Sequence, residues 1–402
     1  MLKKRWYLIA LLIAFSLTIS AAPKPYLILV SFDAFRWDYL NRGLSPVLEK
    51  VRQEGVSALS LKPTYPSKTF PNHLSIITGM YPAHHGIIAN NFLDQFTGKL
   101  YRMNDSISSR DGRWYLGEAF WETAERQGII TASYFWPGSE LALPYRHPTY
   151  YQAYDHQRPY EKRVDGVIDW LKLPADKRPH FITLYCHETD SQGHRYGPDS
   201  PQTNDAIKRL DEVAGYLLSK LDEIKMRDSV NVVFLSDHGM TEVSAERSIN
   251  IEKILGDIKC KLSDSGPLLF VEPDKGKISE TYNQLKKNEN HYKVYYREEI
   301  PSYFHFEDNP FISPIVVIAD LGWSVVTNRR SDYDGKGNHG YDNNQLDMQG
   351  IFLATGPDFK KNYHTGTLWN IDIYPLLCKL FKIFPRKNID GDLDRIGFIL
   401  KD

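Results

Sequence analysis

The sequence predicts an α/β fold in which a mostly parallel central sheet has helices on both faces and carries a smaller inserted α+β cap. Short apolar runs typical of buried strands alternate with segments whose apolar residues recur at helical spacing. Three of these runs lead into an aspartate, at Asp33, Asp190 and Asp237. Ligands bind beyond the carboxyl ends of the strands in such sheets, so we expect the three carboxylates to share one edge.

The elements follow one another in the order that such a sheet requires. We expect strands within residues 25–33, 129–140, 180–190, 230–238 and 349–357, and helices within residues 69–80, 114–128, 200–226 and 368–381. Thr69 is the expected N-cap of its helix, with Pro71 in the first turn, where a missing N–H costs little.

One segment breaks the alternation of strands and helices. Residues 244–334 are rich in Tyr, Phe and Pro, as in "PSYFHFEDNPFISP". We interpret this segment as an inserted α+β cap within a single catalytic domain of residues 23–402, rather than as an independent domain.

The N-terminal residues 1–22 have the pattern of a signal peptide. Three basic residues precede a moderately long apolar run, and small residues at Ser20 to Ala22 suit cleavage after Ala22. The alternative is a retained membrane anchor, but the run is shorter than the roughly 20 apolar residues that a span needs. We therefore expect export to the periplasm or the extracellular space, without stable membrane insertion after cleavage.

Composition narrows the class of function. The formal charge is −1, and no basic tract suggests a nucleic-acid polymer as a partner. The only cysteines are Cys186, Cys260 and Cys378. An odd count in an exported chain of this size is not a disulfide framework, so any metal site has to use histidines and carboxylates.

Carboxylates and histidines of the required kind recur along the chain. The candidate metal ligands are Asp33, Asp190, His194, Asp237, His238 and His339. Three carboxylates with three imidazoles and no thiolate suit Zn²⁺, with Mn²⁺ or Fe²⁺ also possible. Asp190 and His194 would share a face of a helix, but Gly193 and the downstream Gly197-Pro198 favour a loop.

Other histidines have plainer interpretations. The pair His84-His85 is expected at the surface or behind the site, and His73 is expected to pack inside the first helical turn. His187 lies close to Asp190, and we favour a substrate-contact or structural role for it over a ligand role.

The stretch "TYPSKTFPNH" holds the candidate nucleophile. Two divalent ions about 4 Å apart can clamp the attacking and leaving oxygens of an in-line displacement and can activate a bound hydroxyl. Thr69 lies at a predicted helix start, where backbone N–H groups favour an anion, whereas Thr64 and Ser67 precede it in extended chain. Lys68 could add positive charge beside Thr69, but the direction of its side chain is left open.

The motifs "SFDAFR", "PSKTFPNHLSIITGMYPAHHGIIANN", "WPGS", "TDSQGHRYGP", "SDHGM" and "NHGYDN" occur in this order. Together they resemble the nucleotide pyrophosphatase/phosphodiesterase family of the alkaline phosphatase superfamily, over nearly the whole mature chain. "TDSQGH" departs from the family's more usual "PDxxGH", and this departure leaves both ligands in place.

The resemblance implies a role for each matching residue. Thr69 matches a nucleophile that is transiently phosphorylated, and Asn90 matches an asparagine that hydrogen-bonds a phosphate oxygen. Phe70 and Tyr154 resemble an aromatic pair that sandwiches a nucleobase, with Tyr154 in the more loosely matching surroundings. The implied zinc ligands are Asp190, His194 and His339 for one ion, and Asp33, Thr69, Asp237 and His238 for the other.

By this resemblance the protein is expected to be a two-zinc phosphodiesterase or pyrophosphatase that releases nucleoside 5′-monophosphates through a phospho-threonine intermediate. The expected partner is a small nucleotide or phosphodiester. The alternatives are the same chemistry on lysophospholipid or choline phosphodiesters, and a non-catalytic nucleotide-binding protein of the cell envelope.

Overall fold

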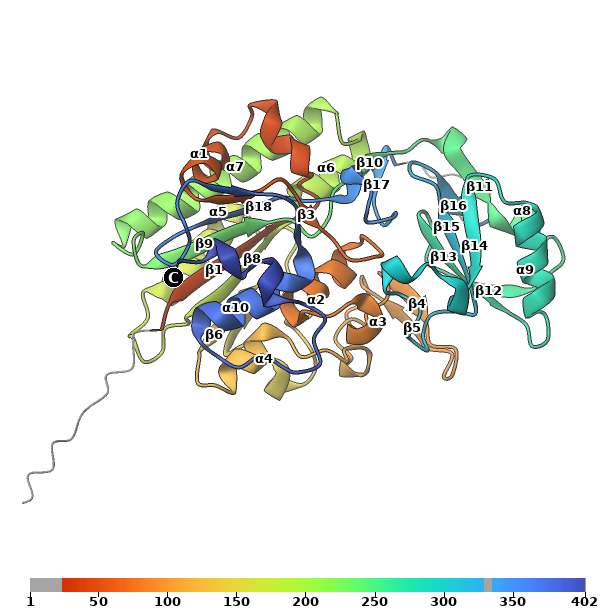
Figure 1. Cartoon of the computed structure of the whole chain (residues 1–402), viewed down its shortest axis with the longest axis horizontal. Helices are drawn as coiled ribbons and strands as arrows, with labels where there is room; N and C mark the ends of the chain where they lie inside the picture. The colour runs from red at the N-terminus through yellow and green to blue at the C-terminus, as the bar shows by residue number, and fades with distance from the viewer. Residues whose placement is uncertain (1–23, 329–334, 402) are drawn as a thin grey trace, which may run out of the picture.

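A computed structural model of the chain describes residues 24–328 and 335–401 (Figure 1). The predicted signal peptide at residues 1–22 lies outside these residues. Within the described ranges, no helix combines the length and the apolar character needed to cross a membrane.

An eight-stranded sheet forms the centre of the molecule. Only β18 runs antiparallel to its neighbours β9 and β2, and all the other pairs are parallel. In spatial order the strands are β19 (Tyr363–Thr365), β2 (Val56–Ala58), β18 (Phe352–Thr355), β9 (Val230–Leu235), β1 (Tyr26–Phe32), β8 (Phe181–Cys186), β6 (Thr131–Tyr134) and β7 (Tyr150–Gln152). The predicted mostly parallel sheet is confirmed.

Helices cover both faces of this sheet, as predicted (Figure 1). One face carries α1 (Pro46–Glu54), α5 (Tyr160–Leu171) and α7 (Pro201–Glu223). The other carries α2 (Thr69–Thr78), the short α3 (Pro82–His85), α4 (Phe120–Glu125) and α10 (Ile373–Phe381).

The central strand β1 shows why the apolar runs are continuous. Leu27 and Leu29 pack into the core on the α2 face, and Ile28, Val30 and Phe32 pack into the core on the α7 face. A strand that is buried on both sides cannot alternate polar with apolar residues. Each of these fully buried side chains contributes about 1.5–3 kcal/mol to stability, which fixes the register of the strand and with it the place of the residue that follows.

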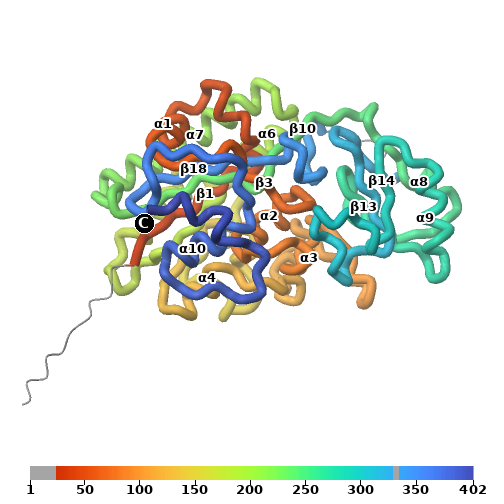
Figure 2. Tube along the Cα trace, viewed as in Figure 1, coloured from red at the N-terminus to blue at the C-terminus, as the bar shows by residue number. Residues whose placement is uncertain are grey.

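A second, antiparallel sheet lies at one end of the molecule (Figures 1 and 2). Its strands are, in spatial order, β12 (Cys260–Ser263), β13 (Leu268–Pro273), β15 (Ile315–Ala319) and β14 (Tyr292–Tyr296), and they pack with α8 (Ile251–Leu255) and α9 (Ile278–Lys287). The domain boundaries of 23–402, with a cap at about 244–334, stay a prediction.

Short strand pairs complete the fold. They are β10 (Thr241–Glu242) with β17 (Gly337–Asn338), β11 (Ser248–Asn250) with β16 (Ser324–Val326), β3 (Leu61–Lys62) with β20 (Leu368–Trp369), and β4 (Asn91–Leu93) with β5 (Leu100–Arg102). The first two pairs connect the segment around the second sheet to the edge where the strands β1, β8 and β9 end.

The loop expected around Asp190 is wrong, because α6 (Glu188–Tyr196) is a helix. Gly193 does not break α6 but lets it approach its neighbours. A Cβ at Gly193 would lie 3.1 Å from the Met240 side chain, and a Cβ at Gly337 would lie 2.4 Å from the Gly193 carbonyl oxygen. Close packing against Met240 and β17 therefore accounts for Gly193, whereas Gly197, with φ 94°, ends the helix as a turn glycine.

Candidate active site

Two of the predicted carboxylates follow adjacent strands of the sheet. Asp33 comes directly after β1, and Asp237 comes two residues after β9, which pairs with β1 in parallel. Asp190 does not end a strand, since β8 stops at Cys186 and Asp190 lies in the first turn of α6. The adjacent strand ends and the helix that follows β8 bring the three carboxylates to one edge, as the sequence predicts.

Asp33, Asp237 and His238 form the first candidate cluster, and all three are buried. His238 Nε2 lies 3.0 Å from Asp237 Oδ2 and 3.3 Å from Asp33 Oδ1. The Thr69 hydroxyl oxygen lies 3.2 Å from the same His238 nitrogen. A ligand-type nitrogen, two carboxylates and the candidate nucleophile therefore face one small volume.

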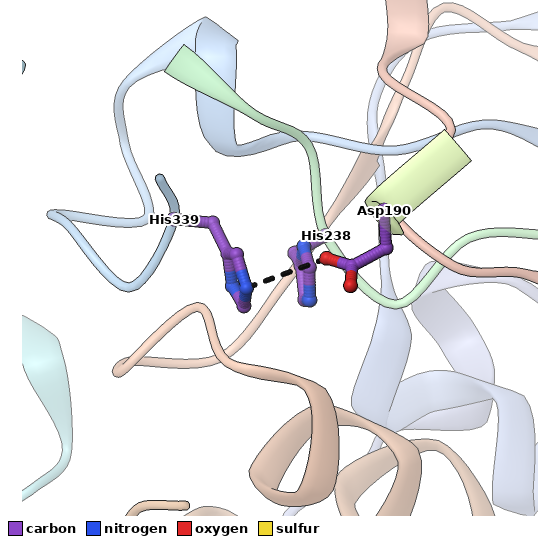
Figure 3. Close-up of side chains that lie close together, drawn as sticks. All are labelled: Asp190, His238 and His339. Atoms are coloured by element: carbon purple, nitrogen blue, oxygen red, sulfur yellow. Dashed lines mark ion pairs between the residues drawn. The ribbon is translucent and has the colours of Figure 1, made fainter. Parts of the chain in front are cut away.

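The second candidate cluster combines Asp190 with His194 and His339. Asp190 Oδ1 lies 3.3 Å from His194 Nε2 and 3.5 Å from His339 Nε2, and the two imidazole nitrogens lie 3.0 Å apart. His238 belongs to this neighbourhood as well, because its ring stacks on His339 with centroids 3.6 Å apart. Figure 3 shows Asp190, His238 and His339 converging from separate elements.

Backbone carbonyls fix the orientation of all three imidazoles. The Nδ1–H groups of His194, His238 and His339 donate to the carbonyl oxygens of Gly337, Gly239 and Ser67, each at 2.9 Å. In each neutral ring the proton is then on Nδ1, and Nε2 keeps a lone pair. The Nε2 lone pairs of His194 and His339 thus point at each other and at the carboxylate of Asp190. Such an arrangement is stabilised by a cation held between the donors.

The carboxylates point to the same conclusion. Asp33 Oδ1, Asp190 Oδ1 and Asp237 Oδ2 are buried oxygens without a hydrogen-bond partner. Burial, together with the neighbouring charges of Asp237 and Asp190, holds the pKa of Asp33 well above its usual range. Buried carboxylates that lack hydrogen bonds are costly unless a cation binds them. The donor set, oxygens and imidazole nitrogens without thiolate, fits divalent ions such as Zn²⁺.

The candidate nucleophile begins helix α2. Thr69 is the first helical residue and Lys68 is the N-cap, so the expected N-cap role of Thr69 is wrong by one position. His73 packs below it, with Nδ1 donating to the Thr69 carbonyl and Nε2 2.8 Å from Ser31 Oγ, as expected for a residue inside the first turn.

Asn90 lies beside the same helix start. Its Oδ1 accepts a hydrogen bond from the backbone N–H of Phe70 at 3.2 Å. The carbonyl side of the amide is therefore occupied, and its NH₂ group is the part that can donate to an anion at Thr69.

A pocket of about 530 Å³ opens beside these groups. It is lined by Asp33, Thr69 and Asp190 together with the two predicted aromatic residues, Phe70 and Tyr154. Phe70 is half-buried, whereas Tyr154 is exposed and packs edge-on against Phe135 with ring centroids 5.3 Å apart. The structure thus brings two of the candidate ligands, the nucleophile and both aromatic rings to one cavity, while His194, Asp237, His238 and His339 adjoin those two ligands without lining it.

One residue of the site, Tyr185, is absent from the sequence-based prediction. Tyr185 donates a 2.5 Å hydrogen bond to Asp33 Oδ2 and lines the pocket. Its position near the end of the strand before Asp190 was the available signal. Of the pair expected at the surface or behind the site, His85 is buried, with Nε2 3.0 Å from the Pro71 carbonyl oxygen, and His84 is exposed.

Comparison with known proteins agrees with this architecture. A family model described as "Type I phosphodiesterase / nucleotide pyrophosphatase" matches residues 27–342. The chain is 37% identical to human ectonucleotide pyrophosphatase/phosphodiesterase family member 1 over 94% of its length, but spans only 42% of that protein. It is 36% identical to human family member 5, covering 92% of this chain and 77% of the relative.

A relative from Xenopus laevis, a bis(5′-adenosyl)-triphosphatase, is 37% identical, with 95% of this chain and 83% of that protein covered. Among solved structures, murine family member 5 matches with a TM-score of 0.89 at 33% identity, over 94% of this chain and all of that one. An inactive form of the same murine protein, in complex with AMP, matches with a TM-score of 0.90 at 33% identity, over the same shares of the two chains.

The family match covers most of the chain, and the solved relatives match its fold over 94% of its length. The chain therefore belongs to the type I phosphodiesterase / nucleotide pyrophosphatase family, hydrolases of phosphodiester and pyrophosphate bonds within the alkaline phosphatase superfamily.

Proposed function

We propose that this protein hydrolyses phosphodiester or pyrophosphate bonds of nucleotides and releases nucleoside 5′-monophosphates. The observation that carries the proposal is the convergence of three carboxylate oxygens without a hydrogen-bond partner and three oriented imidazole nitrogens near Thr69, beside a pocket with aromatic walls. The AMP complex of the murine relative supports a nucleotide as the substrate class.

In this proposal Thr69 Oγ attacks phosphorus and the bond from phosphorus to the leaving oxygen breaks. Water then attacks the phospho-threonine from the side that the leaving group has vacated, which regenerates the Thr69 hydroxyl. Asn90, oriented by the Phe70 N–H group, donates to a phosphoryl oxygen while negative charge develops there. Phe70 and Tyr154 hold the nucleobase between their rings.

Two Zn²⁺ ions are the proposed cofactors. Asp190, His194 and His339 would hold one ion, and Asp33, Thr69, Asp237 and His238 would hold the other. When bound, the ions would lower the pKa of the Thr69 hydroxyl and offset charge on the attacking and leaving oxygens. The backbone carbonyls that fix the histidine tautomers keep the Nε2 lone pairs directed at these positions.

Substitution of the nucleophile tests the proposal. Thr69→Ala should lower turnover of a nucleoside 5′-monophosphate ester by at least about 1,000-fold, because the variant cannot form the covalent intermediate. Thr64→Ala is the matched control, since it removes a nearby hydroxyl that contacts Asn72 and Ser75 rather than the pocket. A Thr69→Ala enzyme within tenfold of the parent would contradict the mechanism.

The substrate class and the metal need separate measurements. Elemental analysis of the purified protein should give about two zinc ions per chain. A panel with a nucleotide ester, a lysophospholipid and a choline phosphodiester should show the highest kcat/KM for the nucleotide, since a stacked base contributes about 1–3 kcal/mol to binding. Preference for the choline ester would assign the alternative substrate class.

We also propose that the protein is exported and acts outside the cytoplasm. The predicted signal peptide at residues 1–22 is one support, and the relatives named as ectonucleotide pyrophosphatases are the other. Fractionation of producing cells, with N-terminal sequencing of the released protein, tests both export and cleavage after Ala22.

A further inference from the structure

His187 lines the pocket from the short connection between β8 and α6. Its side chain is nearly buried, with 8% of the residue exposed, and it faces the same cavity as Thr69 and Tyr154. The ring of His156 stacks on it, with centroids 3.9 Å apart and an interplanar angle of 24°. Among the described residues, ring contacts with His156 and Tyr160 rather than hydrogen bonds position the His187 ring.

The His187 ring has unused hydrogen-bonding capacity. Its Nδ1 is buried without a partner, and within residues 24–328 and 335–401 no other group hydrogen-bonds the ring. Burial, with the neighbouring His156 and Arg163, lowers its pKa to about 3, so the ring is neutral near pH 7. A buried polar group without a partner costs about 1–3 kcal/mol, and such groups in native proteins call for an explanation.

His156 and His187 lie between the proposed base wall and the cluster of candidate metal ligands. His156 contacts the proposed base wall, because its Nδ1 lies 3.0 Å from the hydroxyl of Tyr154. His187 is three residues before Asp190, at the N-cap of α6, and therefore adjoins the cluster at which the phosphoryl group reacts. The part of a nucleotide that joins the base to the 5′-phosphate is the sugar.

The chemistry of the ring matches a hydroxyl better than a phosphate. A neutral imidazole offers one donor and one acceptor, which are the two roles of a sugar hydroxyl. The carboxylate of Asp190, which lines the same pocket, disfavours an additional phosphate group at this wall. We propose that His187, held by its stack on His156, is a sugar subsite that hydrogen-bonds a ribose hydroxyl and favours ribonucleotides over deoxyribonucleotides. This proposal rests on the proposed nucleotide hydrolysis.

Paired substrates that differ by one hydroxyl test the subsite. ATP, 2′-deoxy-ATP and 3′-deoxy-ATP share the same base and leaving group. Wild-type kcat/KM should be about 5–10-fold lower for at least one deoxy analogue, in line with the loss of one hydrogen bond of about 1 kcal/mol. His187→Phe retains the stack but not the hydrogen bond. The His187→Phe variant should have a kcat/KM for ATP that is lower by a similar factor. Its kcat/KM values for ATP and for the deoxy analogues should differ by less than twofold.

His187→Asn and His84→Phe complete the design. Asn places an amide near the position of Nδ1 and should restore part of the preference. His84 is exposed and pairs with Asp390 away from the pocket, so His84→Phe should leave the ratio unchanged. A His187→Phe enzyme that loses activity equally on all three substrates, or a wild type without preference, would overturn the subsite and leave hydrolysis intact. A wild type that cleaves none of the three would overturn the proposed function and the subsite together.

Discussion

Lys68, the residue before the proposed nucleophile, forms a buried ion pair whose removal gives a sharp prediction. Its ammonium donates to Asp264 Oδ2 at 2.7 Å, and the two side chains are only 7% and 5% exposed. Asp264 lies between β12 and β13, so the pair joins the start of α2 to the second sheet. The perturbation is Asp264→Asn, which removes the charge and little else.

The asparagine is chosen from the local geometry. Asp264 has φ 61°, a left-handed conformation that asparagine tolerates, and its Oδ1 accepts a hydrogen bond from Ser265 N that an amide oxygen can keep. Loss of the carboxylate leaves the Lys68 ammonium buried without a counter-charge, which costs about 3–5 kcal/mol. Lys68→Met should cost a comparable amount, because it leaves the carboxylate unpaired. The double variant should cost at least about 2 kcal/mol less than the sum.

Equilibrium urea unfolding, followed by tryptophan fluorescence, measures these free energies. Glu223→Gln is the matched control, because it breaks the Lys220–Glu223 pair, which is as short at 2.6 Å but has side chains 27% and 59% exposed. That pair should contribute about 0–1 kcal/mol. Single variants that each cost less than 1 kcal/mol, or that add without coupling, would refute the argument that burial makes this pair important.

Three further predictions concern the site and its support. Tyr185→Phe removes the 2.5 Å hydrogen bond to Asp33, so zinc affinity measured by chelator competition should fall about 10–100-fold, and an unchanged affinity would show that the hydroxyl does not orient the ligand. Burial lowers the pKa of His85 to about 3, below the value of about 6.5 expected in the unfolded chain. The unfolded state therefore binds the extra proton, and the stability from this group, complete above pH 6.5, falls as the pH drops toward 3. Between pH 7.5 and pH 5 the unfolding free energy of the wild type should therefore fall by about 2 kcal/mol more than that of His85→Gln. An equal fall in the wild type and the variant would contradict this. A Cβ at Gly239 would lie 2.1 Å from a backbone carbonyl oxygen, so Gly239→Ala should destabilise the protein by at least about 2 kcal/mol in thermal unfolding, whereas Gly366→Ala, with open space around it, should change little.

The placement of Asp33 and Asp237 could be predicted because it depends only on where two parallel strands end. Asp33 and Asp237 follow strands that are buried on both faces, and continuous apolar runs identify such strands. Asp190 reaches the same edge by a different path, through the first turn of α6. There the sequence misled, because Gly193 marks close packing against Met240 rather than a turn, and single-sequence reasoning does not show which neighbour a glycine faces.

The polar contacts around the site could not be predicted. The hydroxyl of Tyr185, the ion pair of Lys68 and the unpartnered ring of His187 each depend on where a distant segment lies. No local periodicity encodes these contacts. The direction of the Lys68 side chain, left open by the sequence, is toward Asp264 and so away from the role of an additional phosphate-binding charge.

The antiparallel strand β18 has a consequence for how the protein folds during synthesis. β2 belongs to the first part of the chain, yet both of its partners in the sheet, β18 and β19, follow the last candidate ligand, His339. During synthesis β2 leaves the ribosome long before β18. It therefore has no strand partner until most of the chain has been made. The sheet and the set of candidate ligands are thus completed at the same late stage of synthesis. A chain truncated before His339 would lack both β18 and a complete set of candidate ligands.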